Sequence, residues 1–178
     1  MKKPAMLPIA AIAAAFVLLL GLSFALHGLG SARAQSEHER IMHTILPGSN
    51  EFMVEPYTGE DTNIKSIHKA ENGYIVETVT DGYAGEIRMM VGVSNEGTVT
   101  GLVVMDMEET YGLGANALTD HKFLSQMLNT SGEAEVGTNV DAISGATVTS
   151  KAVVRSVNSA VAFVTGADVG SGATSWGG

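Results

Sequence analysis

The stretch Asp141-Ala142-Ile143-Ser144-Gly145-Ala146-Thr147 decides how this sequence is interpreted, and it continues through Val148-Thr149-Ser150 into an apolar-periodic run. Gly145 and Ala146 are small, so the main chain there can approach a ligand closely. The first N–H groups of a helix have no acceptor within that helix, and the helix dipole attracts an anion to them. The stretch therefore predicts either a phosphate-binding turn or an ordinary turn from a strand into a helix.

Apolar periodicity on both sides of this stretch predicts helices. Residues 149–164 carry an apolar stripe at helical spacing, and residues 119–128 carry a shorter one. Nearer the N-terminus, Ser36-Glu37-His38-Glu39 has the pattern of a capping box, which predicts a helix over 36–46 that ends at Pro47.

Strand-like runs occupy the middle of the chain, at residues 74–80, 87–93 and 98–105. The turn Ser94-Asn95-Glu96-Gly97 joins the second and third of them as a hairpin. Residues 140–143 predict one more short strand, whereas residues 48–63 show little periodicity and predict a loop. The order of these elements predicts an α+β domain with a mainly antiparallel sheet flanked by helices.

Composition narrows the chemistry that the chain can carry. There is no Cys among 178 residues, which excludes disulfides, thiolate zinc sites, iron–sulfur clusters and attached c-type haem. The chain from residue 34 onward contains seven Lys and Arg residues and all nineteen Asp and Glu residues, which gives a net charge of −12. Such an acidic surface repels nucleic acid. The five His show no His-Glu-x-x-His pattern, so no metal site is expected.

The N-terminal segment predicts a membrane anchor. Residues 5–26 lie in an uncharged stretch and would rise about 33 Å as a helix, enough for the hydrocarbon core of a bilayer. A signal peptide is the alternative, because Ala32-Arg33-Ala34 resembles a cleavage site, but the apolar region is longer than signal peptides usually have. We favour the uncleaved anchor. Lys2 and Lys3 then stay in the cytoplasm and the domain is exported.

The chain therefore divides into four parts. Residues 1–30 form the cytoplasmic N-terminus and the transmembrane helix, and residues 31–35 form a linker of small residues. Residues 36–165 form the exported domain. Residues 166–178 are a Gly/Ser-rich tail in which no fixed structure is expected.

Two further stretches accompany the first. Glu109-Thr110-Tyr111-Gly112-Leu113-Gly114 follows a predicted strand, and Gly82-Tyr83-Ala84-Gly85-Glu86-Ile87 opens another. Their glycines permit close approach of the backbone.

Together, the three stretches resemble bacterial FMN-binding domains. That family shows the flavinylation motif Asp-x-x-Ser/Thr-Gly-Ala-Thr, the motif His-x-Glu-Thr-Pro-Gly-Leu-Gly and the strand start Gly-Tyr-x-Gly-x-Ile. This chain has Met107 in place of the His and Tyr111 in place of the Pro.

The resemblance implies that Thr147 carries FMN through a phosphoester bond made by a separate flavin transferase. Thr147 would be an acceptor, and no residue is expected to be catalytic. The phosphate is expected near the Ser144, Thr149 and Ser150 hydroxyls and the isoalloxazine ring near residues 109–114. The residues expected to contact the cofactor are Ser144, Gly145, Ala146, Thr149, Ser150, Lys151, Glu109, Thr110, Gly112, Leu113, Gly114 and Asp141.

Two membrane complexes contain such a domain behind one N-terminal helix. One is the Rnf complex, an ion-translocating ferredoxin:NAD oxidoreductase, through its G subunit. The other is the sodium-translocating NADH:quinone oxidoreductase, through its C subunit, which is typically longer. The resemblance therefore favours an electron-transfer subunit of an Rnf-type complex that works with other membrane subunits. The alternatives are a C-type subunit of a sodium-translocating NADH:quinone oxidoreductase, a stand-alone FMN-binding protein, and a non-redox exported module for ligand binding or assembly.

The tail contains a near-copy of the motif, Asp168-Val169-Gly170-Ser171-Gly172-Ala173-Thr174. No apolar-periodic run follows it, so no helix start is expected there to hold a phosphate. Thr147 is therefore preferred over Thr174 as the attachment residue.

Overall fold

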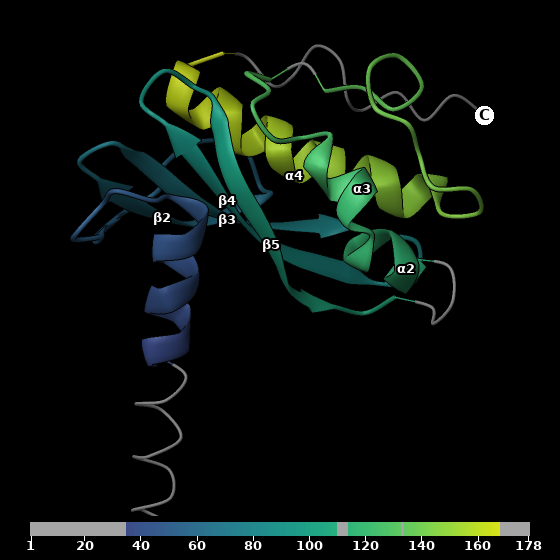
Figure 1. The fold of residues 1–178 in the computed structure, drawn as a ribbon, viewed down its shortest axis with the longest axis horizontal. Coiled ribbons are helices and arrows are strands. Elements are labelled where there is room, and N and C mark those ends of the chain that lie inside the picture. The colour runs from purple at the N-terminus through teal and green to yellow at the C-terminus, as the bar shows by residue number, and fades with distance from the viewer. Residues whose placement is uncertain (1–34, 110–113, 133, 168–178) are drawn as a thin grey trace, which may run out of the picture. The chain divides into compact units, whose positions relative to one another are not determined.

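The computed structural model describes residues 35–109, 114–132 and 134–167 (Figure 1). The chain separates into two units, Met1–Arg40 and Ile41–Gly178, and the second contains every named strand and helix. Residues 35–45 are helical. The predicted anchor at residues 5–26 and the tail from residue 168 lie outside the described residues. Within the described residues, no helix combines the length and apolar character needed to cross a membrane.

The described residues form one five-stranded sheet with strand order β1-β2-β3-β4-β5, in which every neighbouring pair is antiparallel. This order means that each strand pairs with the next one in sequence. The strands are β1 (Met53–Glu55), β2 (Ile64–Ala70), β3 (Gly73–Asp81), β4 (Glu86–Ser94) and β5 (Val99–Met107). The expected α+β domain with an antiparallel sheet is therefore confirmed.

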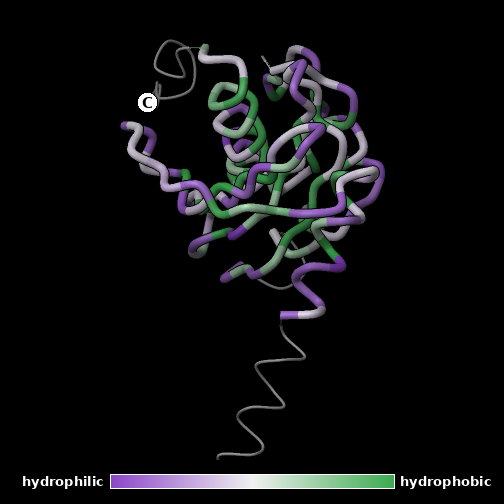
Figure 2. The backbone as a smooth tube through the Cα atoms, turned by 90° about the vertical axis from the view of Figure 1, so that its left-hand side faces the viewer, coloured by the Kyte–Doolittle hydropathy of each residue, from purple (hydrophilic) through white to green (hydrophobic). Residues whose placement is uncertain are grey.

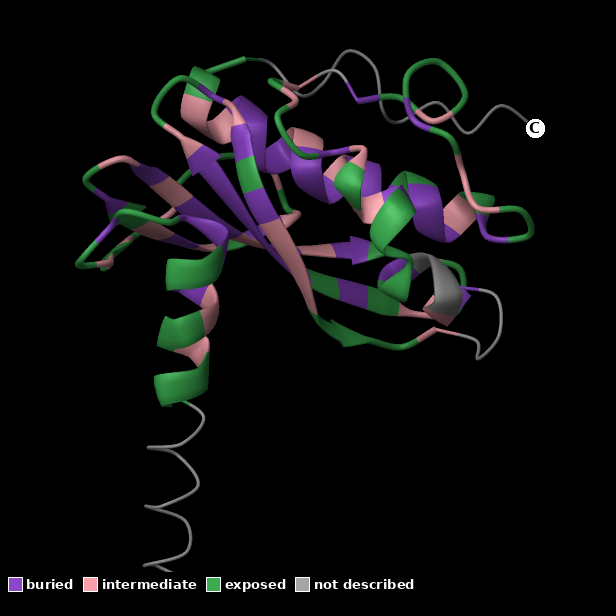
Figure 3. Ribbon diagram, in the orientation of Figure 1, coloured by how far each residue is buried: buried purple, intermediate pink, exposed green. Residues whose placement is uncertain are grey.

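Helix α4 (Thr147–Thr165) packs on one face of this sheet. Side chains alternate between the two faces of a strand, so Val76 of β3 and Val91 of β4 point to the same side and are completely buried there. Val153 and Val157 of α4 complete that core. Figure 3 shows buried residues running through β3, β4 and α4, and Figure 2 shows hydrophobic residues concentrated in the same elements.

The opposite face of the sheet is covered by residues 41–46, which belong to the same unit as the sheet. Met42 and Ile45 pack there against Ile75 and Met90, which alternate with the residues that face α4. Gly92 and Gly101 pair across β4 and β5 and leave room for the Ile45 backbone. A Cβ atom on Gly101 would lie 2.7 Å from Cα of Ile45, far inside van der Waals contact.

Most of the strand and helix predictions are confirmed. The runs at 74–80, 87–93 and 98–105 correspond to β3, β4 and β5, and the hairpin turn at 94–97 closes with a hydrogen bond from Ser94 N to Thr98 O of 2.8 Å. The helix predicted over 149–164 is α4, which begins two residues earlier.

β2 was not predicted from the sequence, and β1 lies inside the predicted loop. The buried residues of β2 are Ile64, Ile67 and Ala70. They recur at every third position, whereas a strand with one buried face has a buried residue at every second position. A register irregularity between Ile64 and Ser66 shifts the strand by one position and breaks that alternation.

Three local predictions are wrong in detail. The helix predicted over 119–128 is shorter in the structure, where α3 covers only His121–Ser125 and the carboxylate of Asp120 caps its start by accepting a hydrogen bond of 2.9 Å from Phe123 N. The short helix α2 (Gly114–Thr119), which was not predicted, precedes it. The short strand predicted at 140–143 is only a bridge between Val136 and Val140. Residue 35 is already helical, so the first helix does not start at Ser36.

The glycine pair under Ile45 yields a stability prediction. We expect Gly101→Ala to lower the free energy of unfolding by about 1–3 kcal/mol, because the added methyl group forces Ile45 away from the sheet. Urea denaturation of the full chain, followed by circular dichroism, measures this. Val54→Ala on the exposed edge strand β1 is the control, and equal stability of the two variants would contradict the packing role of Gly101.

Candidate functional site

The predicted phosphate-binding turn is a hydrogen-bonded turn directly before α4. Ala146 N donates to Ile143 O at 2.9 Å, and Gly145 has a φ of +79°, as the third residue of a type II turn requires. The buried Ser150 hydroxyl donates to Ala146 O at 2.9 Å and accepts from Ile143 N at 3.2 Å. Ser150 therefore ties the turn to the first turn of α4.

The loop that leads into this turn is held by Gln126, which follows α3. Its side-chain amide donates to Asp141 O at 3.2 Å and its side-chain oxygen accepts from Asp141 N at 2.8 Å. The backbone of Asp141 is thus fixed by a pair of hydrogen bonds, whereas its carboxylate is exposed. Gln126 was not predicted as part of the site, because no local sequence signal marks a residue that contacts a loop fifteen positions away.

The N-terminus of α4 has the donors that an anion needs. The residue at the N-cap position is Ala146, which has no side-chain group to cap the helix, and the first turn contains no acidic residue. Thr147, Ser144 and Gly145 are exposed at this end, and Lys151 is exposed one turn further along the helix. The first N–H groups of this 19-residue helix are therefore available to a phosphate group, and the residues present fit one.

The carboxylate of Glu109 joins all three stretches that the sequence singled out. Its Oε1 atom accepts one hydrogen bond from Tyr83 N, at 2.6 Å, and another from the Thr149 hydroxyl, at 3.1 Å. One oxygen atom thus connects the turn between β3 and β4 to the first turn of α4. Thr149 is completely buried, so its hydroxyl faces Glu109 rather than solvent.

The glycines beside this carboxylate have a packing function. A Cβ atom on Gly82 would collide with Oε1 of Glu109, and one on Gly114 would collide with Oε2. The sequence suggested that these glycines let the backbone approach a ligand. In the structure they make room for a side chain of the protein itself.

Not every predicted residue lies in the described part of the chain. Thr110, Gly112 and Leu113 fall outside it. Gly114 is buried at the start of α2, and Met107, which occupies the position of the family's His, ends β5 with 38% of its surface exposed.

Arg155 is a residue of the site that was not predicted. It lies four residues beyond Lys151 and eight beyond Thr147, which places the three side chains along one face of α4. Its guanidinium donates a hydrogen bond of 2.6 Å to Asp81 O at the end of β3. Burial lowers the pKa of Arg155, and the nearby charge of Asp81 opposes that shift. The spacing of 147, 151 and 155 was the signal that could have identified it.

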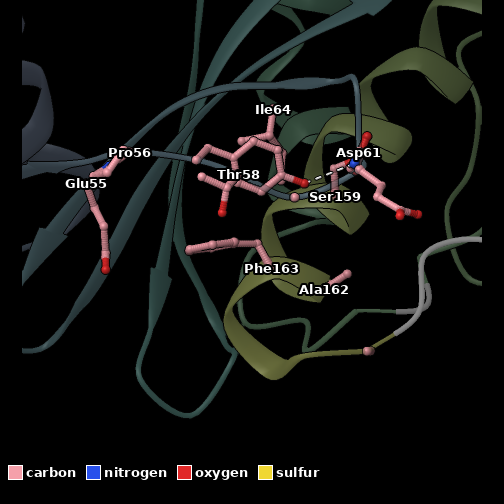
Figure 4. Close-up of a pocket in the computed structure, with 12 residues that line it drawn as sticks. Glu55, Pro56, Thr58, Asp61, Ile64, Ser159, Ala162 and Phe163 are labelled. Carbon is pink, nitrogen blue, oxygen red and sulfur yellow. Dashed lines mark hydrogen bonds between the residues drawn. The ribbon is translucent and has the colours of Figure 1, made fainter.

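A separate cavity of about 490 Å³ lies toward the other end of α4 (Figure 4). Ser159, Ala162 and Phe163 line it together with the loop over residues 55–61. Ser159 is twelve residues beyond Thr147, which is about 18 Å along a helix. The described lining residues include none of the predicted cofactor contacts, so this cavity is distinct from the candidate site.

Comparison with known proteins assigns the chain to a family. The family model described as FMN-binding domain matches residues 82–162, from the turn after β3 to the last part of α4. The chain is also 35% identical, over 176 residues, to the G subunit of the ion-translocating oxidoreductase complex of Methanosarcina acetivorans. That alignment covers 89% of this chain and 90% of the relative.

Two further relatives align over shorter parts. The G subunit of the Na⁺-translocating ferredoxin:NAD⁺ oxidoreductase complex of Acetobacterium woodii is 38% identical over 132 residues, which cover 69% of this chain and 61% of that protein. The G subunit of the proton-translocating ferredoxin:NAD⁺ oxidoreductase complex of Clostridium ljungdahlii is 37% identical over 99 residues, or 52% of this chain and 53% of that protein.

The family match identifies an FMN-binding domain at residues 82–162. Because the Methanosarcina relative matches along nearly its whole length, the chain belongs to the family of ion-translocating oxidoreductase complex G subunits.

The shared carboxylate oxygen predicts energetic coupling between Glu109 and Thr149. We expect Glu109→Ala to lower the free energy of unfolding by about 1–3 kcal/mol, since it leaves the Tyr83 N–H and the Thr149 hydroxyl without their acceptor. Thr149→Val should cost less, and the double variant should cost less than the two single effects together. Urea denaturation of the four proteins measures the coupling. Additive effects would contradict the shared hydrogen bond.

Proposed function

We propose that this chain is the membrane-anchored electron-transfer subunit of an Rnf-type ion-translocating ferredoxin:NAD oxidoreductase complex, with FMN bound through a phosphoester to Thr147. The observation that carries the proposal is the exposed hydroxyl of Thr147 at the uncapped start of α4, directly after a turn that requires glycine. A transferase can reach an exposed hydroxyl, and the helix start stabilises the phosphate that it attaches.

Each described residue near Thr147 then has a defined role. The N–H groups of the first turn and the Ser144 hydroxyl donate hydrogen bonds to the phosphate, and Lys151 adds a positive charge one turn away. Thr149 and Ser150 act differently from the sequence-based expectation. Their hydroxyls are engaged with Glu109 and with the turn at 143–146, so they position the helix start instead of contacting the phosphate.

FMN, when bound, supplies the redox chemistry, while the protein supplies position and electrostatic environment. A covalent bond suits a domain on the extracytoplasmic side, where lost cofactor is not readily replaced. We place the domain there because residues 5–26 have the length and apolar character of a single-pass anchor, with Lys2 and Lys3 on the cytoplasmic side.

The names of the relatives support a role inside a multi-subunit complex. All three are G subunits of complexes described as translocating ions, and two of those complexes are ferredoxin:NAD⁺ oxidoreductases. On this proposal, electrons reach and leave the flavin through neighbouring membrane subunits, and this chain by itself contains no catalytic residue.

Thr147 is proposed over Thr174 because a helix start is what holds the phosphate. The residue after the turn at 143–146 begins a 19-residue helix packed on the sheet. The residues around Thr174 are instead rich in Gly and Ser, a composition with low helix propensity.

Two threonine variants test the attachment residue. Thr147→Ala should abolish covalent flavin when the chain is produced together with its flavin transferase, whereas Thr174→Ala should leave it unchanged. In-gel flavin fluorescence of the denatured protein and the mass of the modified peptide measure this.

Circular dichroism of Thr147→Ala controls for folding, which should be unaffected because the side chain is exposed. Retained flavin in Thr147→Ala would overturn the assignment to this residue. If the chain without any substitution is colourless when it is purified from cells that contain the transferase, this result would support the non-redox alternative.

A further inference from the structure

Tyr83 is an exposed aromatic residue beside the candidate flavin site. It lies in the turn between β3 and β4, and 72% of its surface is accessible to solvent. Most of the ring is therefore free to contact a bound group, and turns between strands are common places for binding residues. Tyr83 belongs to the strand-start motif but is not among the residues predicted to contact the cofactor.

The backbone around Tyr83 is held in place from three sides. Its N–H donates to Glu109 at 2.6 Å, and Gly82 N donates to Gly85 O at 2.8 Å across the same turn. On the other side of Gly82, Asp81 O accepts the 2.6 Å hydrogen bond from Arg155 of α4. The ring is therefore presented to solvent from a backbone that is already ordered.

The same contacts place Tyr83 close to the start of α4. The Tyr83 N–H and the Thr149 hydroxyl both donate to Oε1 of Glu109, at 2.6 and 3.1 Å. The distance between the Tyr83 nitrogen and the Thr149 hydroxyl oxygen therefore cannot exceed the sum of these two values. Thr149 is in the first turn of α4, two residues beyond Thr147. A group tethered to Thr147 by a flexible chain, as the ring of FMN is by its ribityl chain, can therefore reach Tyr83.

We propose that the ring of Tyr83 stacks on the isoalloxazine ring of FMN attached to Thr147, an inference that rests on the function proposed above. Aromatic rings gain from offset stacking beyond the area they bury. Because the turn is ordered before the flavin arrives, stacking fixes only the Tyr83 side chain and costs little further conformational entropy. Tyr83 thereby shields one face of the flavin from water and limits its motion about the tether.

Flavin spectroscopy on the intact, flavinylated chain tests this contact. Tyrosine quenches the fluorescence of a flavin on which it stacks, so Tyr83→Leu should raise the fluorescence per covalently bound flavin severalfold and change the visible circular dichroism of the flavin. Tyr83→Phe retains the ring and should restore the circular dichroism signal. Since the ring is mostly exposed, neither substitution should unfold the domain, and far-ultraviolet circular dichroism checks this.

Two controls separate this contact from other effects. Val54→Ala alters an equally exposed apolar residue on β1 and should leave the flavin spectra unchanged. Tyr111→Leu tests the other tyrosine of the motif segments. If peptide mass shows flavin on Thr147 but the spectra of Tyr83→Leu are unchanged, the stacking inference is overturned and the proposed function still stands. A spectral change that appears only in Tyr111→Leu would have the same meaning. Absence of flavin from Thr147 in the chain without any substitution would overturn the proposed function as well.

Discussion

The candidate site depends on one carboxylate oxygen. Oε1 of Glu109 accepts hydrogen bonds from Tyr83 N and from the Thr149 hydroxyl, and so joins the end of β3 to the start of α4. Glu109 is half-buried, and both of its described donors bind Oε1, while Oε2 is buried without a hydrogen-bond partner among the described residues. The space it occupies also explains the absence of side chains at Gly82 and Gly114. Three stretches that are far apart in the sequence are thus constrained by the same group.

Helix α4 contributes both to the core of the domain and to the candidate site, at different places along its surface. One side is buried against the sheet through Val153 and Val157, while Thr147, Lys151 and Arg155 follow one another along another side. The sheet is itself held from its other face by Met42, Ile45 and Leu46. A site built on such packed elements keeps its donors oriented before a cofactor is attached.

Much of the fold could be predicted because β3, β4, β5 and α4 have regular apolar patterns and the hairpin turn has suitable residues. The failures have physical causes. β2 contains an irregularity that removes its alternation, and the cap at Asp120 makes α3 start two residues later than predicted. For the site, the sequence identified the stretches but not their connections. Gln126 contacts only the backbone of Asp141, and such a partner leaves no sequence pattern, whereas the spacing of Arg155 from Thr147 and Lys151 gave a signal that was not used.

The sequence by itself determined the class of elements, the acidic and cysteine-free chemistry of the domain, and the turn-to-helix stretch that ends at Thr147. These follow from local patterns, since glycine at a positive φ and apolar residues at helical spacing act within a few residues. Only the tertiary structure decided that Thr149 and Ser150 point inward, that Glu109 serves the protein scaffold, and that the exposed Tyr83 lies near the start of α4. The contacts of Ser150 are local, but those of Thr149 and Tyr83 with Glu109 join residues separated by tens of positions. Only the folded chain brings those distant residues together.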